Sequence, residues 1–466
     1  MADVRVVVVG GGIAGLTAAW LASGAAEVTL LEASGRFGGK LWGGEVGGVR
    51  VDLGAESMLA RRPEAVELAR EVGLAEELEP PTTAKAAIWT RGALRPLPGG
   101  QLMGVPGDLT ALAASGVLSA EGVERAGHEG EAEVGADVSI GAYVAAKLGR
   151  EVVDRLVEPL LGGVYAGHAD EISLRAAVPA LLPIAQRGGS LAAGVRELVA
   201  RPSSSGPVFQ GLRGGLGTLP EAVVDACRKN GAELRTDSPV QELRRTSEGW
   251  RVVSNGEVLY ADAVILAVPA PQAAKLLTAE LPSVAAELNT VEYAGMALVT
   301  MAFRRADLDT VLSGSGFLVP PVDGREIKAS TFSSNKWGWL ERSAPDSFLL
   351  RTSLGRHREE AALALPDEEL VARSRAALAE AVGLHAKPYD SAVTRWEGGL
   401  PQYPVGHLDR VARIRAAVAG IGGLAVCGAA YDGVGIPACV ASARRAVNEV
   451  LTPGAGASFT EGRMGT

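Results

Sequence analysis

The sequence predicts an α/β protein organised around a parallel β-sheet whose strands come from separate parts of the chain. Residues 4–9 form an apolar run rich in valine, which is typical of a strand buried on both faces. A glycine-rich turn (10–15) and a helix of small residues follow it at once. Strand-like and glycine-rich segments return in residues 211–275 and 390–451. This alternation favours one Rossmann-like unit assembled from three separated blocks.

The turn after the first strand fits the pattern G-x-G-x-x-G, with Gly10, Gly12 and Gly15. Gly10 allows a tight turn, Gly12 lets a pyrophosphate approach because it has no Cβ, and Gly15 lets the helix pack close to the strand. A second strand (28–31) ends in Glu32, about 20 residues past the glycines, where an acid binds ribose hydroxyls. The helix N-terminus adds a positive dipole end. This order of elements predicts a nucleotide site rather than a glycine turn without a ligand.

Two further glycine segments narrow the choice of nucleotide. Residues 36–40 read Arg-Phe-Gly-Gly-Lys after the acid, and an enzyme that binds only a nicotinamide needs no such extension. An ordinary turn is the alternative for the glycine pair taken alone. Near the C-terminus, a strand (424–429) leads to the turn Gly-Val-Gly-Ile-Pro (433–437), which opens a helix. A helix N-terminus there suits an isoalloxazine ring that gains negative charge on reduction, and a plain loop is the alternative.

The composition restricts the class of protein. The 466 residues suffice for about three domain-sized units, and 47% hydrophobic against 21% charged residues indicates a globular chain. A net charge of −9 argues against nucleic acid as a partner. Three cysteines without C-x-x-C spacing argue against a disulfide framework, and five scattered histidines predict no metal site. We expect neither a signal peptide nor a transmembrane segment, and a peripheral membrane contact stays open.

Local patterns predict the remaining elements. Helices are expected over 63–73, 101–160 with a mobile connection at 121–138, a stretch ending at 227, 367–382 and a stretch ending at 451. Strands are expected at 86–90, 93–97, 232–236, 240–244, 250–253, 258–261 and 263–269, and several between 291 and 354 predict an antiparallel sheet. Residues 185–210, which include a Pro-Ser-Ser-Ser-Gly run, are expected to form a long flexible loop.

Arg61 and Arg62 stand between the 52–57 turn and a proline-led helix. Two adjacent arginines near a cofactor could receive carboxylates in forked hydrogen bonds, and a solvated basic pair is the alternative. His407, which follows Gly406, is expected to serve packing or capping.

Several longer runs carry a resemblance to a known family. They are Leu102-Met103-Gly104-Val105-Pro106, residues 158–167 (EPLLGGVYAG), residues 400–403 (LPQY) with Gly406-His407, and residues 433–437 (GVGIP). Through them almost the whole chain resembles the bacterial porphyrinogen oxidases related to protoporphyrinogen oxidase, within the monoamine-oxidase-like FAD superfamily. More narrowly, the chain is similar to the Gram-positive-type coproporphyrinogen III oxidases.

This resemblance implies an enzyme with non-covalently bound FAD that oxidises a porphyrinogen with molecular oxygen in haem biosynthesis. Six electrons would leave the macrocycle in three two-electron steps, each yielding hydrogen peroxide. It also implies a cytoplasmic location and a possible contact with the ferrochelatase-type enzyme that acts next. No general base is expected, because the flavin drives the chemistry.

The resemblance and the motifs together give the expected site residues. The expected FAD contacts are Gly10, Gly11, Gly12, Ile13, Ala14, Gly15, Glu32, Ala33, Arg36, Gly38, Gly39, Lys40, Gly54, Ala55, Glu56, Ser57, Val240, Ala267, Trp396, Gly428, Gly433, Val434, Gly435 and Ile436. The expected substrate contacts are Arg61, Arg62, Tyr165 and Tyr403.

The expected domains follow the same division. Residues 1–75, 211–275 and 390–451 would form a discontinuous Rossmann-like FAD-binding domain. Residues 76–100, 170–210 and 276–389 would form an α+β substrate-binding domain, residues 101–169 a helical insert, and residues 453–466 a disordered tail.

Three other functions stay open from the sequence. Protoporphyrinogen IX carries two propionates where coproporphyrinogen III carries four, and the sequence does not show the rim of the site. A flavin amine oxidase would share the FAD fold. A non-catalytic protein that binds FAD or porphyrin is the third alternative, and it is disfavoured because a complete cofactor fingerprint usually serves redox chemistry.

Overall fold

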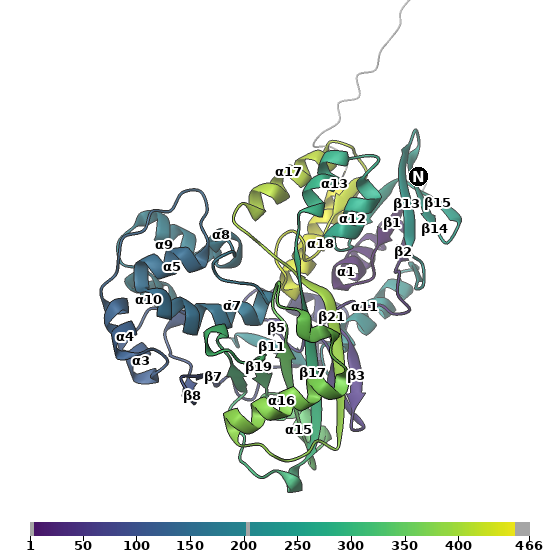
Figure 1. Cartoon of the computed structure of the whole chain (residues 1–466). Helices are drawn as coiled ribbons and strands as arrows, with labels where there is room; N and C mark the ends of the chain where they lie inside the picture. Colours follow the sequence, from purple (N-terminus) through teal and green to yellow (C-terminus); the bar gives the residue numbers. More distant parts are fainter. Residues whose placement is uncertain (1–3, 202–205, 453–466) are drawn as a thin grey trace, which may run out of the picture.

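The computed structural model describes residues 4–201 and 206–452, so the predicted tail at 453–466 and residues 202–205 of the predicted loop lie outside it. Figure 1 shows three lobes: a parallel-sheet lobe with both ends of the described chain, an antiparallel sheet beneath it, and a lobe of helices to one side. These lobes meet at the centre of the molecule, near the start of α18 and the end of α7.

Five parallel strands form the sheet of the first lobe in the order β12-β2-β1-β16-β22. Their bounds are Arg5–Val9 for β1, Glu27–Leu31 for β2, Glu233–Arg235 for β12, Ala263–Leu266 for β16 and Leu424–Val426 for β22. In β1, Val6 and Val8 enter the core on one face, and Val7 and Val9 enter the core on the other. The prediction of a parallel strand buried on both faces is confirmed.

Helices cover both faces of this sheet, as in a doubly wound fold. One face packs against α1 (Ile13–Ala22), α2 (Glu64–Glu71), α11 (Thr218–Lys229) and α18 (Ile436–Leu451). The other packs against α12 (Ala270–Leu277), α13 (Pro282–Asn289), α17 (His407–Ala419) and the ribbon β13 (Val240–Thr246), β14 (Gly249–Ser254) and β15 (Glu257–Ala261). Asn255 and Gly256 turn between β14 and β15 with positive φ at both positions, as a two-residue hairpin loop requires.

A seven-stranded sheet forms the second lobe, in the order β21-β17-β20-β19-β18-β7-β8. The bounds are Ala86–Thr90 (β7), Ala93–Pro96 (β8), Tyr293–Arg304 (β17), Gly316–Leu318 (β18), Ile327–Thr331 (β19), Ser347–Leu354 (β20) and Asp390–Pro401 (β21). All neighbours are antiparallel except β18 and β7. Helix α16 (Asp367–Val382) covers one face through Leu370 and Leu378. The predicted antiparallel sheet and the predicted helix are confirmed.

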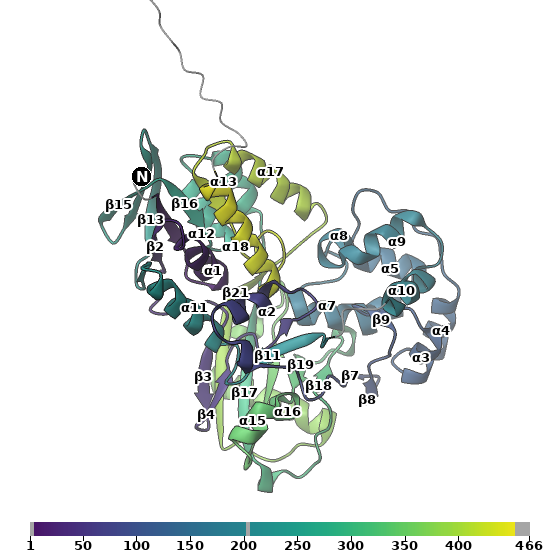
Figure 2. The same ribbon diagram turned by 180° about the vertical axis from the view of Figure 1, so that it is seen from behind.

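The third lobe is a cluster of short helices around one apolar core, seen from behind in Figure 2. They are α3 (Leu109–Ser115), α4 (Ala120–Gly127), α5 (Ile140–Leu148), α6 (Arg150–Val152), a π-helical turn (Val153–Val157), α7 (Glu158–Tyr165), α8 (Leu174–Ala177), α9 (Leu182–Arg187) and α10 (Leu191–Ala200). Serines cap four of them, because a hydroxyl accepts a hydrogen bond from a free amide of the first turn: Ser119, Ser139, Ser173 and Ser190.

Short ribbons join the lobes. They are β3 (Gly43–Val46) with β4 (Val49–Asp52), β9 (Gln101–Leu102) with β10 (Val105–Pro106), and β5 (Met58–Leu59) and β6 (Leu78–Glu79) on either side of β11 (Phe209–Leu212). Two short helices, α14 (Ser333–Lys336) and α15 (Gly338–Ser343), precede β20.

Three local expectations were wrong. Residues 101–106 form the β9-β10 ribbon instead of a helix, because Met103 and Gly104 take positive φ and turn the chain back. The expected mobile connection at 121–138 begins inside α4, which Ser119 caps. The expected loop at 185–210 contains α10, whose Leu191 and Val195 are buried in the helical core. The composition of these segments did not indicate α4 and α10, since their polar residues act as caps or lie on the outer face.

The division of the chain into domains stays a proposal, with two stretches moved. Residues 390–401 form β21, which pairs with β17 and so belongs to the antiparallel sheet. Helices α8, α9 and α10 share the core of α3 to α7, so residues 174–200 belong with the helical lobe.

Candidate cofactor and substrate site

The turn between β1 and α1 is shaped by glycine contacts that no other residue could make. A Cβ on Gly10, whose φ is +107°, would lie 2.8 Å from the Ala267 carbonyl oxygen, and a Cβ on Gly15 would lie 1.8 Å from the Gly10 oxygen. A Cβ on Gly12 would meet nothing within 4 Å. Gly10 and Gly15 therefore serve packing, whereas Gly12 faces open space at the uncapped N-terminus of α1.

Glu32 stands at the end of β2, beside this turn. Its Oε2 accepts a hydrogen bond of 2.6 Å from the Gly11 N–H, and its Oε1 accepts bonds from the Ser34 N–H and hydroxyl at 2.8 and 2.7 Å. A carboxylate offers about four acceptor positions, so capacity for a further donor such as a ribose hydroxyl is left. The structure thus brings the predicted acid and the predicted glycine turn together.

The second glycine pair docks directly on the first turn. The Gly38 N–H donates to the Gly11 oxygen at 2.8 Å, and Gly38 forms a parallel bridge with Gly12. A Cβ on Gly39 would lie 3.1 Å from the Gly12 Cα. Residues 38–39 therefore form a second wall beside Gly12.

Arg36 and Lys40 place positive charge at this wall. The Arg36 Nη2 donates to the Gly39 oxygen at 2.8 Å, and its guanidinium lies 4.4 Å from the centroid of the Trp42 ring. The Lys40 side chain is exposed, yet the protein around it lowers its pKa through burial, and its charge acts on Cys439 of α18.

The C-terminal glycine turn closes the same region. Gly428, with φ +115°, follows β22, and the nearest atom to a Cβ there would be the Ala14 Cβ at 3.9 Å. Gly435 precedes α18 without a side-chain cap, so the first amides of this helix are free as well. Ile436 packs in the parallel-sheet core and Val434 against the core of the helical lobe. Two uncapped helix N-termini therefore border one region.

Residues 52–57 tie this region to the antiparallel sheet. Buried Asp52 accepts hydrogen bonds of 2.9 Å from the N–H groups of Leu216 and Gly217, and burial raises its pKa to about 6. Glu56 is paired with Lys336 at 2.7 Å and Arg351 at 3.3 Å. Burial opposes the charged form of Glu56, but the two cations outweigh it and lower its pKa to about 2.

Glu56 therefore links the parallel-sheet lobe to the antiparallel sheet. The predicted residues beside it lie nearer to the wall that residues 38–39 form. Arg351 also donates to the Gly54 oxygen at 2.7 Å, and the Ala55 N–H donates to the Lys40 oxygen at 3.2 Å. Ser57 follows at the start of β5, half-buried.

Trp396 of β21 reaches the same place from the antiparallel sheet. Its Nε1 donates to the Leu53 oxygen at 3.2 Å, and its ring meets the Trp42 ring edge-on at 6.1 Å. Trp42 was missed from the sequence, although a tryptophan two residues after the Gly-Gly-Lys run was a usable signal. Val240 begins β13, and Ala267 lies against the Gly10–Gly15 turn. Ala33 is exposed just beyond Glu32.

Tyr165 and Tyr403 lie side by side next to the C-terminal glycine turn. Their ring centroids are 5.6 Å apart, and the Tyr403 hydroxyl donates to the Ala429 oxygen. Burial raises the pKa of Tyr165 to about 12, so its phenol is neutral at ordinary pH. His407 stacks on Tyr403 at 4.0 Å, and its Nε2 contacts the Tyr431 oxygen at 3.1 Å. The interpretation of His407 as a packing residue agrees with this geometry.

The two predicted arginines lie at the surface near the start of α2. Arg62 forms an ion pair with Glu64 of α2 at 2.6 Å, and α2 packs against α18. Arg61 is exposed beside it. Among residues 4–201 and 206–452, no group of His, Cys, Asp or Glu has the arrangement of a metal site.

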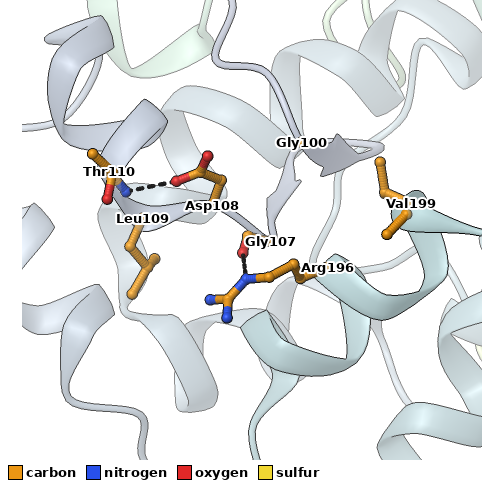
Figure 3. A pocket seen from close by; sticks show the side chains of 8 residues that line it. Gly100, Gly107, Asp108, Leu109, Thr110, Arg196 and Val199 are labelled. Carbon is orange, nitrogen blue, oxygen red and sulfur yellow. Dashed lines mark hydrogen bonds between the residues drawn. The ribbon is translucent and has the colours of Figure 1, made fainter.

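A separate cavity of about 510 Å³ lies in the helical lobe (Figure 3). Gly107, Asp108 and Thr110 line one side and Arg196 of α10 the other. The Arg196 Nε donates to the Gly107 oxygen at 2.9 Å, and the Asp108 carboxylate accepts from the Thr110 N–H at 2.9 Å. None of its lining residues belongs to the glycine turns.

The residues present fit a dinucleotide with a flat ring. The open space at Gly12, the ribose-binding acid, the glycine pair and the second uncapped helix match the diphosphate, the sugar and a ring that accepts negative charge. Residues 13–451 match the sequence profile of the family described as flavin containing amine oxidoreductase. The chain belongs to this family, and it is an FAD-dependent oxidoreductase with a monoamine-oxidase-like fold.

Individual relatives are more specific. The coproporphyrinogen III oxidase of Mycobacterium tuberculosis is 38% identical over 452 residues, which cover 95% of this chain and 96% of the relative. The protoporphyrinogen oxidase of Bos taurus is 29% identical, covering 96% of this chain and 98% of the relative. The crystal structure of a putative protoporphyrinogen oxidase from Exiguobacterium sp. 255-15 is 34% identical and superposes with a TM-score of 0.85, covering 96% of this chain and 98% of that one. In the described part of the chain, none of the helices combines the length and the apolar character that crossing a bilayer requires.

Proposed function

We propose that this chain oxidises coproporphyrinogen III to coproporphyrin III in the cytoplasm, as a step of haem biosynthesis. The observation that carries the proposal is the 38% identity, over nearly the whole chain, to a coproporphyrinogen III oxidase. The balanced reaction removes six hydrogens from the macrocycle in three two-electron steps and converts three O₂ to three H₂O₂.

Bound FAD would supply a two-electron acceptor that oxygen regenerates. The chain's own part is to hold and orient the reactants. In this proposal Gly12 and the N-terminus of α1 bind the diphosphate, Glu32 binds the ribose, and residues 433–436 lie against the flavin ring. The other expected contacts at residues 36–40, 54–57, 240, 267, 396 and 428 complete this site.

The substrate would lie where the aromatic pair adjoins the C-terminal turn. Tyr165 and Tyr403 would form an apolar wall, and the neutral phenol of Tyr165 avoids a buried charge beside the macrocycle. Arg62 would bind a substrate carboxylate in exchange for its bond to Glu64. The product would pass to a ferrochelatase-type enzyme, and a contact between the two enzymes is part of the proposal.

A second candidate substrate is protoporphyrinogen IX, which the similarity to the bovine protoporphyrinogen oxidase favours. The deciding experiment compares both porphyrinogens under air with the purified holoenzyme, following porphyrin fluorescence and peroxide against a control for autoxidation. We expect a higher kcat/KM for the substrate with four carboxylates and three peroxides per porphyrin. A preference for protoporphyrinogen IX would move the enzyme to that substrate, and turnover of amines alone would reject the porphyrinogen proposal.

A further inference from the structure

Two cationic side chains are buried together at the seam between the antiparallel sheet and the helical lobe. Lys328 of β19 is 5% exposed and Arg356, which follows β20, is 6% exposed. Their charges interact, and the Val319 backbone joins their segments. The Val319 N–H donates to the Lys328 oxygen at 2.7 Å, and its own oxygen accepts from the Arg356 Nη2 at 3.0 Å.

Neither cation has a carboxylate partner among the described residues. Arg356 makes its only side-chain hydrogen bond within the described chain to Val319, and no described residue forms a hydrogen bond or ion pair with the Lys328 ammonium. Burial, followed by the charge of Arg356, lowers the pKa of Lys328 to about 7. Burial of unpaired charge is costly, and natural proteins usually pair such groups.

The nearest acidic groups are already engaged or exposed. Glu158 of α7 acts on Arg356, but its two oxygens bind His168 at 3.2 Å and the Ala169 N–H at 2.7 Å. The hydrogen bond that Glu158 accepts from His168 raises the pKa of His168 to about 9, so His168 is protonated at pH 7 and offsets the charge of Glu158. Glu359 also acts on Arg356, and its side chain is 55% exposed. Neither acid therefore forms a direct pair with Lys328 or Arg356.

Direct contacts connect this seam to the proposed substrate region. Helix α7 packs against β18 and β19, and the N–H of His357, next to Arg356, donates to the Ala166 oxygen at 2.7 Å. Ala166 follows Tyr165, whose ring lies beside Tyr403. The two cations are thus connected to the C-terminal glycine turn through His357, Ala166 and the Tyr165–Tyr403 pair. An irregularity in the pairing of β19 with β20 falls at Lys328, between Ile327 and Ala329.

We propose that Lys328 and Arg356 form a carboxylate-binding site that takes one propionate of the tetrapyrrole substrate. The inference rests on the proposed function, because that function supplies a substrate with several carboxylates. A carboxylate between an ammonium and a guanidinium would form charge-assisted hydrogen bonds and remove the unpaired charge. The site would select substrates by the charge of their carboxylates.

The test measures binding to the FAD-loaded enzyme without turnover. The probes are coproporphyrin III, the oxidised tetracarboxylate, and its uncharged tetramethyl ester, both titrated by porphyrin fluorescence in the same dilute detergent. Lys328→Met and Arg356→Gln should weaken binding of the acid by roughly 10- to 100-fold, because each removes a hydrogen bond to a charged group. The same two substitutions should change binding of the ester by less than about twofold.

Two controls separate binding from folding. Lys275→Met removes an exposed lysine of α12 and should bind both probes as the unmodified enzyme does. Lys328→Arg keeps the charge and should retain most of the affinity for the acid. Lys328→Met should melt at the same temperature as the unmodified enzyme or higher, since it removes an unpaired buried charge; should it fail to accumulate, Lys328→Gln carries the same comparison.

Unchanged binding of the acid to Lys328→Met, or equal weakening of acid and ester, would overturn the inference and leave the proposed function standing. If the unmodified enzyme oxidises neither porphyrinogen and binds neither probe, the proposed function is rejected, and the inference that rests on it is rejected too. A loss confined to the charged probe supports both.

Discussion

The Gly11 N–H donates a 2.6 Å hydrogen bond to the Glu32 Oε2, which joins the glycine turn of β1 to the acid at the end of β2. The two residues are 21 positions apart, and the parallel pairing of β1 with β2 brings them together. The carboxylate therefore supports the turn from the end of the neighbouring strand.

We expect Glu32→Ala to weaken FAD binding by roughly 10- to 100-fold, because a charged acceptor is lost from the sugar and from Gly11. Equilibrium dialysis of FAD against the apoenzyme measures the change. Glu27→Ala is the matched control, since Glu27 is the exposed residue at the other end of β2. Tight, stoichiometric FAD in the Glu32 variant would remove this residue from the cofactor site.

Substitutions of Gly12 and Gly15 in the first turn should have different effects on the enzyme. Gly12→Ala adds a methyl group into open space, so the apoenzyme should fold normally and lose FAD because the methyl group occupies the diphosphate position. Gly15→Ala places a methyl group 1.8 Å from the Gly10 oxygen and should lower the stability of the apoenzyme itself. Melting temperatures with and without FAD distinguish the two, and equal melting of the two apo variants would contradict this assignment.

The buried Glu56 should make Lys336 essential for stability. Lys336→Met leaves Arg351 as the one cation paired with the Glu56 carboxylate in the described chain and should lower the free energy of unfolding by about 3 kcal/mol, as for other broken buried pairs. The double variant Glu56→Gln with Lys336→Met should lose less than the sum of the single changes. Denaturant titration measures all three, and strict additivity would argue against a coupled pair.

The His168–Glu158 pair predicts a loss of stability at alkaline pH. The pKa of His168 is raised from 6.5 to about 9 in the folded state, so its contribution is complete below pH 6.5 and is lost as pH rises through 9. It should amount to on the order of 2 kcal/mol. Thermal melting between pH 6 and pH 9.5 should show a steeper decline for the unmodified enzyme than for His168→Gln. His128→Gln, at an exposed histidine, should follow the unmodified profile.

Arg62 should affect substrate binding more than chemistry. Arg62→Ala should raise KM for the porphyrinogen several-fold while kcat changes little, as expected for a contact made equally in the ground and transition states. Arg70→Ala, at an exposed arginine of α2, serves as the control. An unchanged KM would exclude Arg62 from the substrate site.

Much of the nucleotide unit could be predicted because its signals are local. The valine run, the spacing of Gly10, Gly12 and Gly15, and the acid at Glu32 each report on backbone geometry within a few residues. The hairpin at Asn255–Gly256 and helix α16 were predictable for the same reason. By contrast, α10 was missed because the Pro-Ser-Ser-Ser-Gly run that follows it was interpreted as part of one long loop, and only burial of Leu191 and Val195 defines the helix.

The sequence by itself determined the class of cofactor, the glycine turns and the family resemblance, since these depend on residue types at fixed short spacings. Only the tertiary structure decided which distant residues share one environment: Glu56 with Lys336 and Arg351, Trp396 with Trp42, and Lys328 with Arg356. Pairing across strands and lobes sets these contacts, and a chain carries no local signal for the partner that will neutralise, or fail to neutralise, a buried charge.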